Sequence, residues 1–312
     1  MSDNPTKHTK VLIIGSGPAG YTAAVYASRA MLKPILVHGM EPGGQLSTTT
    51  DVENFPGFAE VIQGPWLMEQ MKEQALKVGT EFHHDIVNSV KFDDKPFLAE
   101  TDSGIKFNSK TIIIATGAQA RWLNLESENK FKGFGVSACA TCDGFFFKDL
   151  EVVVVGGGDS AMEEALFLTK FAKKVYVVHR RDSFRASKIM QDRVINHEQI
   201  NVLWNKEITE IKGDKKVSSV TVKDLKENTE EDMNIDGVFL AIGHTPNVSF
   251  LEGLLELDDK GYIKTGFTTD TSTSVPGIFA AGDVADSVYR QAITAAGTGC
   301  QAAIDAERWL DN

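Results

Sequence analysis

The sequence predicts an α/β protein that contains the same supersecondary unit twice. A glycine-rich turn lies between an apolar run and a helix-like segment near Gly15, and again near Gly156. A strand-like apolar run that stops at a glycine follows each unit, ending at Gly117 and at Gly243. The composition is globular, with 42% hydrophobic and 24% charged residues, and 312 residues suffice for about two domains. Repetition on this scale indicates two related domains.

The first unit begins with the apolar run at residues 11–14. It continues through the turn Gly15-Ser-Gly-Pro-Ala-Gly20 into a helix-like segment at 21–31, and a second β-like run covers 34–37. In this context the Gly-x-Gly-x-x-Gly pattern predicts a Rossmann-like dinucleotide site. The glycines permit a tight turn and close approach of the backbone, while the helix N-terminus meets the pyrophosphate.

The second unit repeats this order. The apolar run at 151–155 leads into Gly156-Gly-Gly-Asp-Ser-Ala161, followed by a helix-like segment at 162–171 and a β-like run at 174–178. The sequence therefore predicts that two related domains bind two nucleotides.

The residues that follow the second unit indicate which nucleotide it binds. NAD sites carry an acidic residue about 20 positions after the glycines, which binds the ribose 2′-hydroxyl. The corresponding stretch here begins at His179 and continues with Arg180, Arg181 and Arg185. Because a guanidinium group suits a 2′-phosphate, the pattern favours NADPH. The alternative is a solvated basic run.

The first unit differs at the same place. The same number of residues, counted from Gly15, leads to His38. Glu41 lies two or three positions beyond the place expected for an acidic residue that binds the ribose. Without an arginine pair, this unit is expected to hold a different nucleotide. The glycine-rich and hydroxyl-rich loop at 43–57 either wraps a large cofactor or is an ordinary surface loop.

A further apolar run near the C-terminus ends in Gly282-Asp283. A long helical segment is predicted from near Tyr289 to Trp309. Its N-terminus would carry partial positive charge, which would stabilise a reduced, anionic isoalloxazine ring. Cys300 lies within this small-residue helix and is expected to be packed rather than reactive.

The stretch between the two units carries a cysteine pair, Cys139-Ala-Thr-Cys142, followed directly by Asp143. Two intervening residues let the sulfurs approach closely enough to bond, and this spacing often favours the reactive thiolate. A structural zinc site would need four ligands, and only Cys300 remains among the cysteines. A static disulfide is the other alternative, disfavoured in the cytosol. Asp143 suits either general acid–base chemistry or capping of the next helix.

Charge and the N-terminal sequence limit the classes of function. A net charge of −11 argues against a nucleic-acid partner held by phosphate neutralisation. The polar residues 1–10 are followed by only four apolar residues, so neither a signal peptide nor a membrane span is expected. A cytoplasmic location is predicted.

Together these motifs resemble the low-molecular-weight, bacterial-type thioredoxin reductases, a class II group of pyridine nucleotide-disulfide oxidoreductases. The resemblance runs essentially end to end, and Cys-Ala-Thr-Cys-Asp-Gly between two dinucleotide motifs is highly specific. The matching blocks are Gly15–Ala24, Gly43–Leu46, Val52–Gly57, Ile114–Ala118, Ser137–Gly144, Gly156–Ala161, His179–Arg185, Ala241–Asn247, Gly282-Asp283 and Arg290–Thr294.

The resemblance implies an FAD-binding domain made of residues 1–119 and 248–312. An NADPH-binding domain of residues 120–247, which carries the dithiol, would be inserted into it. It also implies a homodimer. The implied FAD contacts are Gly15, Gly17, Pro18, Ala19, Gly20, Glu41, Gly44, Gln45, Leu46, Asn54, Gly117, Gly282, Asp283, Arg290, Gln291 and Ala292. The implied NADPH contacts are Gly156, Gly158, Asp159, Ser160, His179, Arg180, Arg181 and Arg185.

The mechanism implied is hydride transfer from NADPH to FAD and then reduction of a Cys139–Cys142 disulfide. Cys142 would face the flavin, Cys139 would attack the thioredoxin disulfide, and Asp143 would move the proton. The cysteine pair must reach the flavin and the thioredoxin disulfide and must also leave room for the nicotinamide. Because one rigid arrangement cannot do all three, the resemblance implies domain rotation about segments near 115–121 and 241–247.

Three other functions share parts of this pattern. The flavoprotein of a peroxiredoxin-reducing system carries an N-terminal thioredoxin-like extension, whereas the first nucleotide strand here begins near residue 10. Ferredoxin–NADP reductase relatives lack the dithiol. A non-catalytic flavin-binding protein would not need it. Departures from the resemblance are small: Phe134, and Leu123-Asn-Leu-Glu126 in place of the usual Leu-Gly-Leu-Pro.

Overall fold

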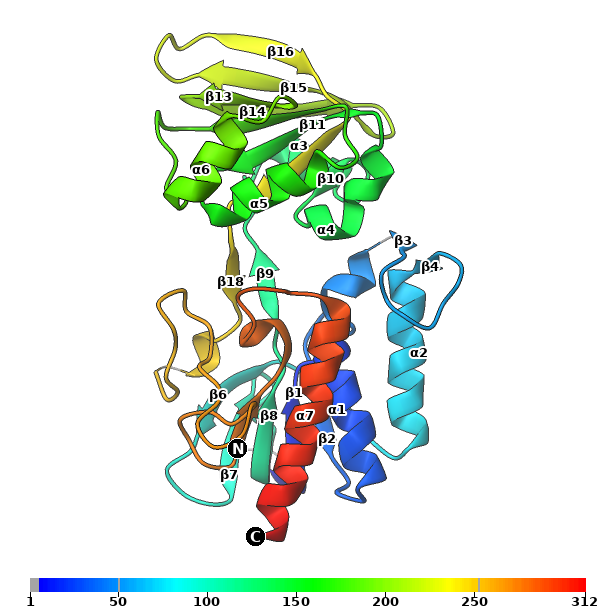
Figure 1. Cartoon of the computed structure of the whole chain (residues 1–312). Helices are drawn as coiled ribbons and strands as arrows, with labels where there is room; N and C mark the ends of the chain where they lie inside the picture. The colour runs from blue at the N-terminus through cyan, green and yellow to red at the C-terminus, as the bar shows by residue number, and fades with distance from the viewer. Residues whose placement is uncertain (1–5, 50, 252) are drawn as a thin grey trace. The chain divides into compact units, whose positions relative to one another are not determined.

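The structure is a computed structural model that describes residues 6–49, 51–251 and 253–312. The chain divides into two compact units (Figure 1). Unit 1 contains residues 1–119 and 245–312, and unit 2 contains residues 120–244. Each unit has its own mostly parallel sheet and its own apolar core. The prediction of an α/β fold with two Rossmann-like units, one inserted into the other, is confirmed.

Unit 1 is organised around a seven-stranded sheet in the order β5-β2-β1-β8-β7-β6, with β19 paired to β8. Strands β5, β2, β1, β8 and β19 are parallel, and β6–β7–β8 is antiparallel. The strands of the sheet are β1 (Thr6–Ile14), β2 (Ile35–His38), β5 (Glu81–His84), β6 (Val87–Lys91), β7 (Phe97–Thr101), β8 (Lys106–Ile114) and β19 (Ile278–Ala280). The other elements are α1 (Pro18–Arg29), η1 (Gly44–Thr48), β3 (Asp51–Val52), β4 (Ile62–Gln63), α2 (Gly64–Lys77), η3 (Ser249–Leu251), η4 (Gly282–Val284) and α7 (Ala292–Asp311).

Both faces of the β1 sheet are covered, which explains the unbroken apolar run that begins at Val11. Helices α1 and α7 pack on one face, where small residues allow a close approach (Figure 1). A Cβ atom added at Gly299 of α7 would lie 2.2 Å from the backbone oxygen of Ala19 in α1. The small-residue sequence of the C-terminal helix is therefore a packing requirement.

Unit 2 contains a five-stranded parallel sheet in the order β10-β17-β11-β12-β13 and a three-stranded antiparallel sheet in the order β14-β15-β16. The parallel strands are β10 (Val136–Ser137), β11 (Glu151–Gly156), β12 (Lys174–His179), β13 (Ile200–Trp204) and β17 (Gly237–Ala241). The antiparallel strands are β14 (Lys206–Gly213), β15 (Val217–Asp224) and β16 (Glu230–Asn234). The helices are α3 (Glu126–Phe131), α4 (Ala140–Asp143), η2 (Gly144–Phe147), α5 (Asp159–Leu168) and α6 (Lys188–Ile195).

Three helices start or end away from the predicted positions. α1 begins at Pro18 rather than Tyr21 because proline fits the first helical turn, and α5 likewise begins directly after its glycine turn, at Asp159. α7 begins at Ala292 rather than near Tyr289. Gln291 caps it through a reciprocal pair of hydrogen bonds with Thr294, which fixes the first helical residue.

The departure at Leu123-Asn-Leu-Glu126 has a local explanation. Asn124 adopts a φ of 62°, a conformation that favours glycine and that asparagine tolerates. The buried carboxylate of Glu128 accepts hydrogen bonds from the backbone N–H groups of Leu123 and Asn124, at 2.9 and 3.0 Å. Asparagine therefore replaces the usual glycine without loss of the turn.

Two short strands, β9 (Ala118–Ala120) and β18 (His244–Pro246), pair with each other where the chain passes between units. The N–H of Arg121 donates to the oxygen of Gly243 at 2.9 Å. Gly117 and Gly243 have φ values of 71° and 99°, and a Cβ atom added at either would meet nothing within 4 Å. The connecting segments thus combine regular pairing with two conformationally permissive positions.

Candidate functional site

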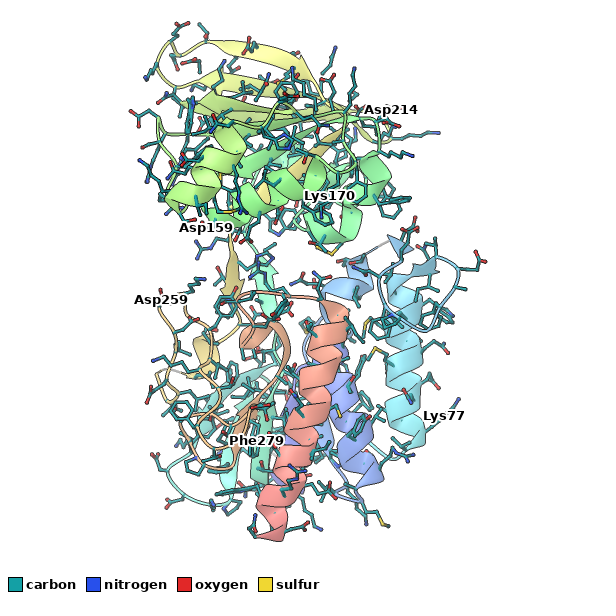
Figure 2. The ribbon with its side chains drawn as sticks, in the orientation of Figure 1. Lys77, Asp159, Lys170, Asp214, Asp259 and Phe279 are labelled. Carbon is teal, nitrogen blue, oxygen red and sulfur yellow. A yellow bond between two sulfur atoms is a disulfide. The ribbon has the colours of Figure 1, made fainter. Side chains whose placement is uncertain are left out.

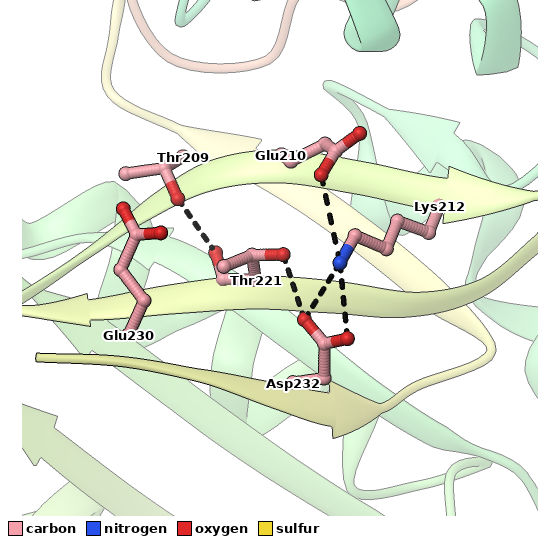
Figure 3. A pocket seen from close by; sticks show the side chains of 6 residues that line it. All are labelled: Thr209, Glu210, Lys212, Thr221, Glu230 and Asp232. Carbon is pink, nitrogen blue, oxygen red and sulfur yellow. Dashed lines mark hydrogen bonds and ion pairs between the residues drawn. The ribbon is translucent and has the colours of Figure 1, made fainter.

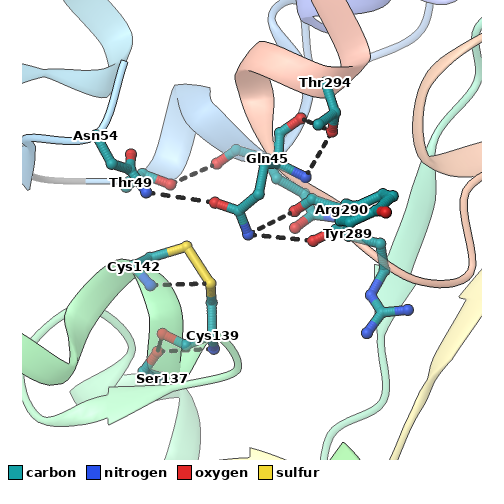
Figure 4. Close-up of a disulfide and its surroundings, with 10 residues drawn as sticks. Gln45, Thr49, Asn54, Ser137, Cys139, Cys142, Tyr289, Arg290 and Thr294 are labelled. Atoms are coloured by element: carbon teal, nitrogen blue, oxygen red, sulfur yellow. Dashed lines mark hydrogen bonds between the residues drawn. A yellow bond between two sulfur atoms is a disulfide. The ribbon is translucent and has the colours of Figure 1, made fainter. Parts of the chain in front are cut away.

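The cysteine pair of unit 2 forms a disulfide. Cys139 and Cys142 are bonded, with their Cα atoms 5.3 Å apart (Figure 4). Cys139 is the residue before α4, and its sulfur accepts a hydrogen bond from the Cys142 N–H at 3.2 Å. The Cys139 N–H donates to the Ser137 hydroxyl at 3.0 Å. Cys139 is half-buried and Cys142 is exposed, so the two sulfurs have different surroundings.

The local sequence explains why the disulfide lies at the surface of a rigid element. β10 ends at Ser137, beside β17, and α4 follows at once. Ala140 and Gly144 are buried, and a Cβ atom added at Gly144 would lie 3.2 Å from a methyl carbon of Leu168 in α5. The small residues of the motif therefore pack the turn against α5, while Cys142 stays accessible.

Asp143 is suited to hold a proton. Burial raises the pKa of its carboxyl group, and a hydrogen bond with the Ser137 hydroxyl opposes this in part. The side chain makes no capping hydrogen bond to η2, the helical turn that follows. The structure thus gives no support to the capping alternative. A partly buried carboxylic acid next to Cys142 can exchange a proton with a departing thiolate.

The three glycines of the first turn fill three different roles. Gly15 has a φ of 109°, and an added Cβ would lie 2.2 Å from the oxygen of Ala115. At Gly20 it would lie 2.0 Å from the oxygen of Gly15, but at Gly17 it would meet nothing within 4 Å. Two glycines therefore allow strand, turn and helix to pack, and the middle one leaves the turn open for a ligand.

The second turn has the same construction. A Cβ atom added at Gly156 would lie 2.5 Å from the oxygen of Ala241, whereas at Gly158 it would meet nothing within 4 Å. Neither helix that follows, α1 or α5, has a side chain capping its N-terminus. The free N–H groups and the open glycines fit the pyrophosphate of a dinucleotide at both turns.

The predicted phosphate-binding arginines lie on a loop that is fixed to the second turn. The N–H of Arg185 donates to the oxygen of Gly157 at 2.7 Å, and the N–H of Ser187 donates to the Asp159 carboxylate at 2.8 Å. Figure 2 labels Asp159 at the start of α5. Arg180, Arg181 and Arg185 are exposed, and their guanidinium groups form no ion pair with the residues that the structure describes.

The predicted NADPH contact His179 has a buried side chain. Its ring is buried, packs on Phe184 and Trp204, and its Nε2 lies 3.0 Å from the Ser183 oxygen. Burial lowers the pKa of its imidazole. A Cβ atom at Gly157 would lie 2.2 Å from the His179 ring. His179 therefore shapes the arginine loop from beneath.

Several of the predicted FAD residues come together in unit 1. The Asn54 amide donates to Gln291 at 3.3 Å, which joins segments 237 positions apart (Figure 4). Gln291 also donates to the oxygens of Tyr289 and Arg290, so much of its hydrogen-bonding capacity is used in shaping the start of α7. The Gln45 side chain donates to the oxygen of Ala118.

Asp283 lies in η4 and its side chain is half-buried. Its carboxylate forms no hydrogen bond with the residues that the structure describes. Burial raises its pKa to about 6; the charge of Asp286 adds to this and that of Arg290 opposes it. A carboxylate of this kind fits the hydroxyl groups of a bound ligand. Among the remaining predicted contacts, Glu41 is exposed beyond β2. The others lie in the first turns of α1 and α7, in η1 and η4, and at the glycine turn after β8: Pro18, Ala19, Ala292, Gly44, Leu46, Gly282 and Gly117.

Sequence reasoning missed two supporting residues. The buried Ser16 hydroxyl accepts from the Gly43 N–H at 3.2 Å and shares a hydrogen bond with the buried phenol of Tyr21. Ser137 contacts both Cys139 and Asp143. Each is a small hydroxyl residue next to a motif, a signal too common in sequences to identify a role.

Unit 2 also contains a polar cavity of about 670 Å³ on its antiparallel sheet (Figure 3). Lys212 lies 2.8 Å from Asp232 and 3.5 Å from Glu210, and the Thr221 hydroxyl donates to Asp232 at 2.8 Å. The ammonium group of Lys212 is thus paired with the carboxylates of Asp232 and Glu210. The cavity lies on the antiparallel sheet, whereas the disulfide lies at the start of α4. In the described ranges, no helix is long and apolar enough to cross a membrane.

Two dinucleotide-type turns and a disulfide within one chain define a nucleotide-linked disulfide oxidoreductase. The family model of the pyridine nucleotide-disulphide oxidoreductases matches residues 9–299. The chain is 60% identical to a thioredoxin reductase of Rickettsia conorii, with 97% of this chain and 98% of that protein covered. It is 53% identical to the thioredoxin reductase of Escherichia coli O157:H7, with 98% and 97% covered.

Solved structures agree with these relatives. A thioredoxin reductase from Giardia duodenalis is 47% identical and superposes with a TM-score of 0.94, covering 98% of this chain and 100% of that one. The thioredoxin reductase of Streptococcus pyogenes is 42% identical, with a TM-score of 0.92 and coverage of 97% and 98%. The chain belongs to the pyridine nucleotide-disulphide oxidoreductase family, and it is an oxidoreductase enzyme.

Proposed function

We propose that the chain is an NADPH-dependent thioredoxin-disulfide reductase that uses FAD. The observation that carries this proposal is the Cys139–Cys142 disulfide on a unit whose nucleotide turn adjoins three exposed arginine side chains. The names of the relatives support thioredoxin as the protein substrate. The proposal includes a homodimer in the cytoplasm, a compartment in which protein thiols are kept reduced.

In this proposal unit 1 holds FAD and unit 2 holds NADPH. The open turn at Gly17 and the carboxylate of Asp283 support the first assignment. The open turn at Gly158 and the guanidinium groups of Arg180 and Arg181 support the second. Bound FAD would supply two-electron transfer from NADPH to the disulfide.

The protein residues then perform thiol–disulfide exchange. Two electrons and two protons convert the disulfide into two thiols. The Cys139 thiolate attacks one sulfur of the thioredoxin disulfide, and the other leaves as a thiolate that takes a proton. Cys142 then attacks the mixed disulfide, which restores the Cys139–Cys142 bond and releases reduced thioredoxin. Asp143, whose pKa is raised by burial, would hold and transfer the proton beside Cys142.

Rotation of unit 2 about its two connecting segments is part of the proposal. The permissive positions Gly117 and Gly243 support it, because each can absorb a change in backbone dihedral angles. A crosslink between the units should separate the half-reactions. A crosslinked protein that reduces thioredoxin at the full rate would contradict rotation.

The central experiment measures NADPH oxidation with a disulfide dye, with and without thioredoxin. Turnover should require thioredoxin and should fall at least about 1,000-fold in Cys139→Ser, since the disulfide can no longer form and Cys139 is the proposed attacking thiolate. With a thioredoxin that lacks its resolving cysteine and carries its remaining cysteine as a mixed disulfide with an aromatic thiol, Cys142→Ser should displace the aromatic thiolate and accumulate a mixed disulfide between the two proteins, and Cys139→Ser should not. Activity that needs no thioredoxin, or that persists in Cys139→Ser, would refute the proposal.

A further inference from the structure

Two histidines end neighbouring parallel strands of unit 1. β2 ends at His38 and β5 ends at His84, and the strand register places these two residues opposite each other. The N–H of Gly15 donates to the oxygen of Val37 at 2.9 Å, so the end of β2 is tied to the first glycine turn. Dinucleotides lie along this edge of a Rossmann-like sheet, with the ribose at the end of the second strand. His38 occupies that position.

The contacts of His38 determine which of its nitrogens carries the proton. Its Nδ1 lies 3.3 Å from the oxygen of Gly39 and 3.4 Å from Nδ1 of His84. A carbonyl oxygen only accepts, and two Nδ1 protons cannot face each other at this distance. The arrangement that satisfies both contacts has the proton on Nδ1 of His38 and a lone pair on Nδ1 of His84. Nε2 of neutral His38 then carries a lone pair.

That lone pair has no hydrogen-bond donor among the described residues around His38. The half-buried ring also favours the neutral form, because burial lowers the pKa of its imidazole. The hydrogen bond to the Gly39 oxygen opposes this in part, and the neighbouring His84, Lys72 and His83 add to the lowering. Glu41, three positions on, is exposed and lies outside β2. The strand end therefore presents a neutral acceptor where many related sites present a carboxylate.

We propose that His38 accepts a hydrogen bond from a ribose hydroxyl of the adenosine half of FAD, and that His84 sets the His38 tautomer required for it. This inference rests on the proposed use of FAD by unit 1. It assigns the ribose contact to His38 rather than to Glu41. His38 acts on cofactor affinity and has no part in the electron transfer.

Comparison of FAD with FMN tests the assignment, because FMN lacks the adenosine half. The full chain is stripped of flavin, and the dissociation constants of both flavins are measured by fluorescence titration. His38→Leu should weaken FAD binding about tenfold and leave FMN binding unchanged, the loss expected for one hydrogen bond. His38→Gln, which restores a neutral acceptor, should recover most of the FAD affinity.

Two further variants separate the competing roles. His84→Phe keeps an aromatic ring but removes the tautomer partner, and it should weaken FAD binding about threefold with no effect on FMN. Glu41→Gln should weaken FAD binding less than His38→Leu does. Equal weakening of FAD and FMN in His38→Leu, unchanged FAD binding, or a larger FAD-specific loss in Glu41→Gln would overturn the inference. A wild-type chain that binds neither flavin would instead overturn the proposed function.

Discussion

The disulfide of unit 2 and the Gly282-Asp283 turn of unit 1 occupy the same place in two copies of one fold. In unit 1, β19 pairs with β8, placing Phe279 beside Ile113. In unit 2, β10 pairs with β17, placing Ser137 beside Phe239. Each pairs in parallel with the equivalent strand of its sheet, and each is followed after one or two residues by a short helical turn, η4 or α4. One fold position thus carries a carboxylate in one unit and a redox centre in the other.

The two turns share a chemical feature. Each contains an aspartate, Asp283 or Asp143, whose pKa is raised chiefly by burial. Asp283 is further affected by the charges of Asp286 and Arg290, whereas Asp143 is hydrogen-bonded to Ser137. In both turns, burial is the main reason that the carboxyl group keeps its proton to a higher pH than usual.

The second residue of the glycine turn differs between the two units. Ser16 in the first turn binds Tyr21 and the N–H of Gly43, which fixes the loop after β2. Gly157 in the second turn has no side chain, and the His179 ring occupies that space instead. One residue inside the turn therefore decides what supports the nucleotide loop that follows.

The largest effect should come from the arginines that distinguish unit 2 from unit 1. Replacing Arg180 and Arg181 by alanine should raise the KM for NADPH by at least about 100-fold, since each charged hydrogen bond contributes ~1.5–3 kcal/mol and the two together contribute ~3 kcal/mol or more. The KM for NADH should change little. Arg193→Ala, an exposed arginine on α6, is the control. A parallel rise for both nucleotides would contradict the 2′-phosphate role.

Adding a methyl group at Gly157 or at Gly158 should distinguish a glycine needed for packing from a glycine needed for the approach of the nucleotide. Gly157→Ala places Cβ against the buried His179 ring and should cost ~1–3 kcal/mol of unfolding free energy. Gly158→Ala meets nothing within 4 Å and should change stability by less than about 0.5 kcal/mol. Both should weaken NADPH binding. Denaturant unfolding and NADPH titration check this, and equal stability losses would contradict it.

Asp283→Asn should change the pH dependence of stability in the flavin-free chain. Because the folded pKa of about 6 exceeds the ordinary value of 3.8 for an aspartate, the stabilisation from Asp283 is full below about pH 4 and is lost as pH rises through 6. The variant should therefore exceed the wild type by up to about 3 kcal/mol at pH 8 and show no gain at pH 4.

Asp286→Asn serves as the control for this prediction. The Asp286 carboxylate accepts hydrogen bonds from the N–H groups of Val288, Tyr289 and Arg290. Its charge also raises the pKa of Asp283, so the variant loses hydrogen bonding but relieves part of the repulsion on Asp283, and it should not show the full gain of Asp283→Asn at pH 8. Unfolding free energies at the two pH values measure both variants. A pH-independent gain in Asp283→Asn would show that ionisation is not the cause.

The smallest effect concerns Ser16. Ser16→Ala leaves the buried Tyr21 hydroxyl without its partner and should cost ~1–2 kcal/mol. If Tyr21→Phe is combined with Ser16→Ala, the total loss should be smaller than the sum of the single losses, because neither hydroxyl is then left alone. Simple additivity would mean that the two residues act independently.

The sequence predicted the repeated units and the nucleotide turns because their glycine spacing has few alternatives. It also predicted the cysteine pair, which is bonded in the structure. It did not reveal that His179 lies under the arginine loop, because that depends on packing against Trp204, a distant residue in the sequence. The cap of α7 by Gln291 is a local contact with Thr294, which the predicted helix start near Tyr289 overlooked. Residue counting identifies the end of a strand, but not the direction of its side chain. The ligand roles of the individual residues stay predictions.

The division of unit 1 into two chain segments also affects the order of events on the ribosome. The apolar face of α1 packs against α7, residues Ala292–Asp311, and unit 2 is encoded between them. At about 5–20 residues per second, α1 waits roughly 15–60 s for its packing partner. Unit 2 is contiguous and completes its core earlier. Newly made chains therefore pass through a stage in which the disulfide-bearing unit is folded while unit 1 still exposes apolar surface, the stage at which a chaperone is most needed.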